Sequence, residues 1–184
     1  MVHEKMEPIE LLKKEHRVIL KLLSTVERIC GAEREWNNGL IEDTQNIVAF
    51  FRKFVDRCHH GKEENLLFPV MEGRGDENLK AAIKEMMDQH VRGRNLVTIM
   101  TQAIDDAREG KTKSTTDFCK AATEYVASLR GHIDIEDSDL FITARSVIPA
   151  GEREKLWEEF ERVGHEEIGE GVHEEFEELV KKLE

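Results

Sequence analysis

Two stretches of the chain carry histidine and carboxylate side chains at a spacing that suits metal binding. In CHHGKEENLLFPVM, His60 and Glu64 are four residues apart, so on a helix they lie on one face, one turn from each other. In HIDIEDSDLF, His132 and Glu136 repeat this spacing. A histidine and a carboxylate placed in this way can both point at one metal-sized volume. Either pattern alone is a weak signal, because glutamate and histidine are common on exposed helix faces.

Two further histidines interrupt rows of apolar residues in the chain. His16 lies midway between Ile9 and Leu23 in a row whose members recur at alternating intervals of three and four residues. His90 interrupts a similar row between Met86 and Val97. Inside a helical bundle, such polar groups would each cost several kcal/mol without partners. A metal would satisfy them together, whereas mutual hydrogen bonding would satisfy only some of them.

The residue types narrow the choice of metal. Imidazole with carboxylate suits iron, zinc or manganese. The absence of cysteine from the set argues against an iron–sulfur cluster or a structural zinc site. On an α-helix His59 lies about 100° round from His60, which favours His60–Glu64 over His59–Glu63 as the inward pair. Six donors would saturate a single ion, so two ions fit better than one.

These residues must be positioned by long helices. Pro8 and Gly31 are typical of the start and end of a first helix, and Pro69 is expected to kink or end the second. The expected helices cover residues 8–31, 40–71, 77–109 and 115–147. Their short connections predict an all-α fold, an up-down-up-down four-helix bundle over residues 1–150. Residues 151–184 are expected to form an acidic helical extension in two pieces. It would pack on the bundle or against a second copy of the chain.

Composition limits the partners. The 184 residues carry a formal net charge of -12, which argues against nucleic acid or an anionic membrane surface as the main partner. The sequence has neither an apolar run long enough to span a bilayer nor a signal-peptide core, so we expect a cytoplasmic location. Cys30, Cys58 and Cys119 form no CxxC pair and are interpreted as small buried residues, without a disulfide.

Taken together, HHGKEENLLFP, HIDIEDSDLF and the two single histidines resemble the hemerythrin-like, or HHE cation-binding, domain over residues 5–150. The resemblance implies a four-helix bundle with a non-haem di-iron centre and an oxo or hydroxo bridge. Members bind oxygen, sense oxygen or iron, or react with nitric oxide or peroxide. Carried over by position, the resemblance implies terminal ligands and bridging carboxylates at His16, His60, His90, His132, Glu64 and Glu136.

The chain departs from the family pattern at two positions. Oxygen-carrying hemerythrins have a further histidine where this chain has Met86, and many HHE members have a glutamate where it has Gly61. The missing ligand disfavours stable oxygen carriage and favours a more open centre. Candidates to complete the site are His59, Asp137, His165 and His173. His3 is interpreted as a terminal residue without a role.

Three functions follow as hypotheses. The first is a protein that binds or senses oxygen or nitric oxide at a di-iron centre. The second is a di-iron enzyme that reduces nitric oxide or peroxide, which would need a redox partner and a proton donor such as Tyr125. The third is a zinc-filled or metal-free helical module that uses its acidic tail to pair with a partner.

Overall fold

The computed structural model describes residues 7–32, 36–111, 113–164, 178 and 181–182. Helices account for the regular structure of this part of the chain, which contains no strand. The elements are α1 (Pro8–Gly31), α2 (Asn38–Phe50), η1 (Phe51–His60), η2 (Glu63–Leu67), α3 (Phe68–Glu72), α4 (Glu77–Arg108), α5 (Ser114–Ile135), η3 (Glu136–Leu140), α6 (Phe141–Val147) and α7 (Ala150–Val163). The labels η1, η2 and η3 denote π-helical segments.

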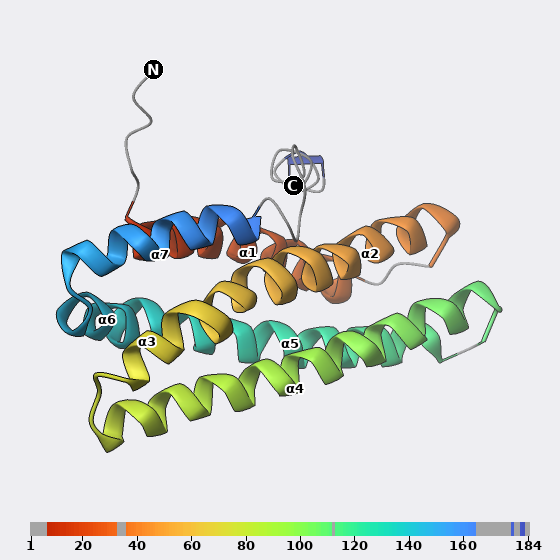
Figure 1. Cartoon of the computed structure of the whole chain (residues 1–184). Helices are drawn as coiled ribbons and strands as arrows, with labels where there is room; N and C mark the ends of the chain where they lie inside the picture. The colour runs from red at the N-terminus through yellow and green to blue at the C-terminus, as the bar shows by residue number, and fades with distance from the viewer. Residues whose placement is uncertain (1–6, 33–35, 112, 165–177, 179–180, 183–184) are drawn as a thin grey trace.

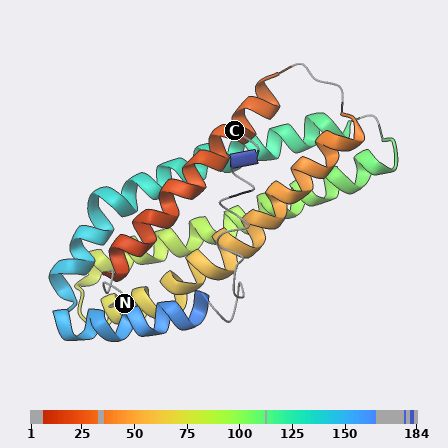
Figure 2. The same cartoon turned by 90° about the horizontal axis from the view of Figure 1, so that it is seen from above.

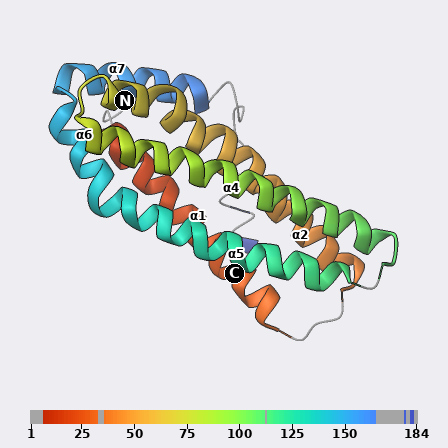
Figure 3. The ribbon, with the colours of Figure 1, turned by 90° about the horizontal axis from the view of Figure 1, so that it is seen from below.

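The elements from α1 to α6 form a bundle of four long helical rods. The first rod is α1, the second runs from α2 through η1 and η2 to α3, the third is α4, and the fourth runs from α5 through η3 to α6. Successive rods run in opposite directions, as Figure 1 shows from the side and Figures 2 and 3 show from above and below. The predicted all-α bundle is therefore confirmed. Among the described residues, no helix has the length and apolar character needed to cross a membrane.

Local sequence signals set the helix ends. Pro8 occupies the first turn of α1, where its missing N–H would have no intrahelical partner anyway. The side chain of Asn37 accepts a hydrogen bond from the backbone N–H of Leu40 at 3.0 Å and caps α2. Asp76 caps α4 in the same way. The helix does not end at Pro69, because it continues to Glu72, close to the expected end at residue 71; a kink at Pro69 stays a prediction. Pro69 cannot join the i→i−4 ladder, and the π segment just before it already departs from that ladder.

The buried apolar side chains form two separate clusters along the bundle axis. On α1, Leu12 belongs to one cluster and Ile19 to the other. On α4, Met86 and Leu96 are divided in the same way. The histidines of the two motifs lie between the clusters, so the bundle has a polar layer where its core would otherwise be continuous. Burial in this layer is close to complete, and a polar group held there needs a partner.

Helix α7 begins the C-terminal segment and packs on one end of the bundle. Its side chains Leu156 and Phe160 are buried in the same cluster as Ile9 of α1. Figure 2 shows α7 lying across the end of the bundle near the start of α1, at an angle to that helix. Most of the second helical piece predicted within residues 151–184 lies outside the described residues. His165 and His173 also lie outside them. The predicted domain boundary at residue 150 stays a prediction.

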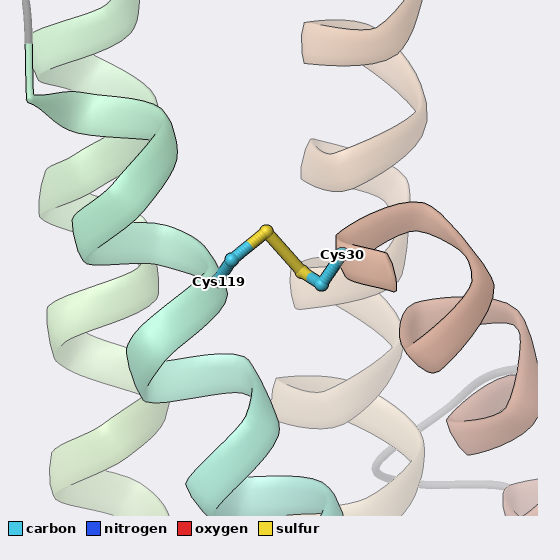
Figure 4. Close-up of a disulfide and its surroundings, with 2 residues drawn as sticks. All are labelled: Cys30 and Cys119. Carbon is cyan, nitrogen blue, oxygen red and sulfur yellow. A yellow bond between two sulfur atoms is a disulfide. The ribbon is translucent and has the colours of Figure 1, made fainter. Parts of the chain in front are cut away.

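A disulfide joins Cys30, at the end of α1, to Cys119 on α5 (Figure 4). The interpretation of these two residues as unpaired cysteines is therefore wrong. The pairing could not be read from sequence, because 89 residues separate the partners and only the packing of α1 on α5 brings them together. Cys58 is a buried thiol outside this bond, as expected. Disulfides are rare in reducing compartments, so the bond weighs against the expected cytoplasmic location.

Replacing Cys119 with serine is expected to lower the free energy of unfolding by about 3 kcal/mol, because the bond closes a long loop in the unfolded chain. Urea denaturation of the wild type and the variant, each with and without a reducing agent, measures this effect. The reducing agent should destabilise the wild type and leave the variant unchanged. Equal stability of the oxidised and reduced wild type would contradict the bond.

Candidate metal centre

The polar layer holds a set of side chains from all four rods whose donor atoms converge. Each side chain is at least 95% buried, and Glu63 and Glu136 are fully buried. The set consists of His16 from α1, His59, His60 and Glu63 from the second rod, His90 from α4, and His132 and Glu136 from the fourth rod. These residues form two groups in which one donor atom from each member lies within 4.8 Å of the others.

The first group contains His16, His59, Glu63 and Glu136. The Nε2 atom of His16 lies 3.3 Å from Oε2 of Glu136. The Nε2 atom of His59 lies 3.5 Å from Oε1 of Glu63. Two imidazoles and two carboxylates therefore face a common volume, which is a donor set suited to a divalent transition metal.

The second group contains His60, Glu63, His90 and His132. The Nε2 atoms of His90 and His132 are 3.0 Å apart, and the rings of His60 and His90 are stacked with centroids 3.7 Å apart. Glu63 belongs to both groups, with Oε1 toward His59 and Oε2 toward His90. Glu136 is also placed between them, because its Oε1 lies 3.1 Å from Nε2 of His132.

The unsatisfied atoms of this layer fit bound cations. Among the described residues, all but one of the buried side-chain nitrogen and oxygen atoms without a hydrogen-bond partner belong to four of these side chains. They include both oxygens of Glu63 and both oxygens of Glu136. An unsatisfied buried carboxylate is costly, whereas coordination of a metal would use the same lone pairs. The donors present therefore fit a metal at each group.

The pKa values of the buried carboxylates and histidines in this layer are also shifted by burial and by their neighbours' charges. Burial, together with the neighbouring charge of Glu136, raises the pKa of Glu63 well above its usual value. Burial would also raise the pKa of Glu136, but His132 and His16 outweigh it and hold that pKa below its usual range. Burial and the nearby histidines lower the pKa of His60 well below 6.5. Two buried carboxylates this close cannot both stay ionised without positive charge between them.

Four of the five histidines are oriented by a hydrogen bond at the ring nitrogen that faces away from the centre. Such outer partners fix the ring and its tautomer in metal sites. The pairs, with their Nδ1 distances, are His16 with Asp137 at 3.0 Å, His59 with Glu15 at 2.9 Å, His90 with Glu64 at 2.7 Å and His132 with Gln89 at 2.9 Å. His60 has no such bond, and its Nδ1 lies 3.9 Å from the carboxylate of Asp56.

One of these outer partners is itself part of a buried ion pair. Glu15 also accepts a hydrogen bond from the ammonium group of Lys62, and both side chains are almost fully buried. Burial alone would raise the pKa of Glu15, but Lys62 and His59 outweigh it and lower it to about 2. Glu15 is therefore ionised at neutral pH and accepts the Nδ1 proton of His59. The Nε2 atom of His59 is left to face the centre.

The structure brings together five of the six predicted site residues, namely His16, His60, His90, His132 and Glu136. Whether each one binds metal stays a prediction. Glu64 lies outside both groups and accepts hydrogen bonds from Nδ1 of His90 and from Arg94.

The preference for His60–Glu64 as the inward pair is corrected, because His59 and Glu63 both face the centre together with His60. The preference assumed a rotation of about 100° per residue, which holds for an α-helix. These residues lie in π-helical segments, whose i→i+5 bonding gives wider turns and a smaller rotation per residue. Adjacent histidines can then share a face. The sequence did contain a signal, because His59 and Glu63 also have the HxxxE spacing.

Of the other candidates to complete the site, His59 joins the first group, while Asp137 bonds to His16 from outside. His3, His165 and His173 lie outside the described residues.

Comparison with known proteins agrees with this geometry. The model of the hemerythrin HHE cation-binding domain matches residues 7–144, which include every member of both groups. A comparison with curated proteins found no significant match. The family match covers most of the chain, so this protein belongs to the hemerythrin HHE cation-binding domain family.

Proposed function

We propose that this protein binds two iron ions in the polar layer and takes up oxygen or nitric oxide there. The observation that carries the proposal is the pair of buried donor groups that share Glu63, with both carboxylates otherwise unsatisfied. A carboxylate that belongs to two groups would supply an oxygen to each of two ions. A single ion would leave one group of donors without a partner.

The donor chemistry supports iron. The two groups offer imidazole nitrogen and carboxylate oxygen without thiolate, a combination that suits iron and also zinc or manganese. When bound, a pair of irons would supply one-electron redox chemistry and an open position for a diatomic ligand. The chain's own residues hold the donors in place through their outer hydrogen bonds. The two apolar clusters keep bulk water away on either side.

One observation favours the enzymatic alternative, in which the same centre reduces nitric oxide or peroxide. The Tyr125 side chain lines a small cavity together with His60, His90 and His132. In this alternative the phenol of Tyr125 would give a proton to a small molecule held beside these rings, since it lines the same cavity. This activity would need a redox partner to return electrons.

Metal analysis of the purified protein with optical spectroscopy tests the proposal. We expect about two irons per chain and a spectrum that changes when the reduced protein meets oxygen or nitric oxide. A stable adduct would support a binding protein, whereas steady turnover with an electron donor would support the enzyme. Less than one metal ion per chain after reconstitution with iron would contradict the proposal. A stoichiometric zinc content that iron cannot displace would also contradict it.

A further inference from the structure

Two cavities lie in series beside the second group of donors. The outer cavity has a volume of about 180 Å³ and reaches the surface between η1 and α4. The inner cavity has a volume of about 10 Å³, close to the space of a single water, and touches the rings of His60, His90 and His132. The walls of both cavities include His60, His90, Gly93 and Tyr125. The two cavities therefore adjoin at these four residues, and the outer one extends from the surface to two of the three histidines of this group.

Gly93 lies in the shared wall of the two cavities, next to the ring of Tyr125. A Cβ atom at this position would lie 3.4 Å from Cε2 of Tyr125. Any side chain longer than a methyl group would therefore extend into the space between α4 and the Tyr125 ring. Gly93 lies in the interior of α4, where glycine is about 1 kcal/mol less favourable than alanine. The helix does not need this glycine for its own stability, but the absence of a side chain lets the Tyr125 ring lie close to α4 in the shared wall of the cavities.

Arg94 of α4 forms hydrogen bonds with residues of two other segments near the outer cavity. Its Nε donates to Oδ1 of Asp56 in η1 at 2.6 Å, and its Nη2 donates to Oε1 of Glu64 in η2. The same oxygen of Glu64 accepts from Nδ1 of His90. Arg94 is 38% exposed and thus lies at the mouth of the cavity. The guanidinium therefore links the three segments around the opening to one of the histidines inside.

We infer that these two cavities form a passage by which small exogenous ligands reach the metal centre, and that Gly93 and Arg94 determine which ligands pass. The inference rests on the proposed metal centre. Its ligand class is molecules of two or three heavy atoms, because the outer cavity of about 180 Å³ holds such molecules and already touches His60 and His90, whereas the space beyond it narrows to about 10 Å³. Both cavities are lined by members of the second group, so along this passage the ligand would arrive on the side of His60, His90 and His132.

The binding rate of azide tests this passage without requiring turnover. The iron-loaded wild type is compared with Gly93→Leu in a stopped-flow experiment that follows the azide spectrum. We expect Gly93→Leu to slow azide association by roughly tenfold or more, with the iron content unchanged. Gly131→Leu is the matched control, since Gly131 lies inside α5 with no atom within 4 Å of a Cβ added there. It should leave the rate unchanged.

Two further variants distinguish an effect on the passage from an effect on folding. Gly93→Ala adds only a methyl group and should give a smaller slowing than Gly93→Leu. Arg94→Ala opens the mouth and should speed association. Wild-type rates in both Gly93 variants would overturn the passage while leaving the metal centre intact, as would a wild type that holds iron but never binds azide. Less than one iron in the wild type would overturn the proposed function itself.

Discussion

Replacing Glu63 with alanine is expected to abolish stoichiometric binding of both ions, whereas Glu64→Ala should keep them. Glu63 is fully buried and belongs to both donor groups. Its removal would take one donor from each of the two proposed ions, because Glu63 is the residue that the two groups share. Each lost ligand weakens binding, and loss of an outer partner alone typically costs 10–100-fold in affinity. Iron content after reconstitution and gel filtration measures the difference.

Glu64→Ala is the matched control because it removes a neighbouring carboxylate of the same helix that lies outside both groups. It should weaken binding without abolishing it, since the Nδ1 atom of His90 loses its acceptor. Circular dichroism of both metal-free variants checks that the bundle remains folded. Iron retained in Glu63→Ala and lost in Glu64→Ala would restore the assignment made from sequence and contradict the geometry.

The choice between Glu63 and Glu64 also shows how far the site could be predicted from the sequence. His16 and His90 could be identified because each interrupts an apolar row, and His132 because of its spacing from Glu136; both patterns are properties of the α-helix. The choice between Glu63 and Glu64 depended on the turn-to-turn geometry of the second rod. That rod is π-helical at both motif positions, and such segments often occur at functional sites. Hydrophobic periodicity does not reveal them.

The residues that hydrogen-bond to the Nδ1 atoms of the histidines could not be predicted from sequence spacing, for a different reason. Glu15 lies 44 residues from His59, and Gln89 lies 43 residues from His132. Each contact exists only because separate rods pack side by side. The Cys30–Cys119 bond has the same origin. Helix ends, in contrast, depend on local residues such as Pro8 and the cap at Asp76, and these were close to prediction.

Replacing Lys62 with methionine is expected to lower the free energy of unfolding of the metal-free protein by about 3 kcal/mol at pH 7. Removal of one partner from a buried ion pair leaves an uncompensated charge, and this typically costs 3–5 kcal/mol. Lys62 is 1% exposed and Glu15 2% exposed, so solvent cannot screen the charge left on Glu15. Urea denaturation measures the change. Lys53→Met, an exposed lysine in the same rod, is the control and should have an effect below about 0.5 kcal/mol.

The pH dependence of the Lys62→Met effect gives a second test. In the wild type the pKa of Glu15 is lowered to about 2, so its contribution to stability is present above 4.5 and lost as the pH falls toward 2. Without Lys62, burial should raise that pKa above 4.5, and the folded variant then gains stability as the pH falls from 7 and Glu15 takes up a proton. The stability difference between variant and wild type should therefore shrink between pH 7 and pH 5. A difference that stays constant over this range would show that Lys62 acts through packing rather than through the charge of Glu15.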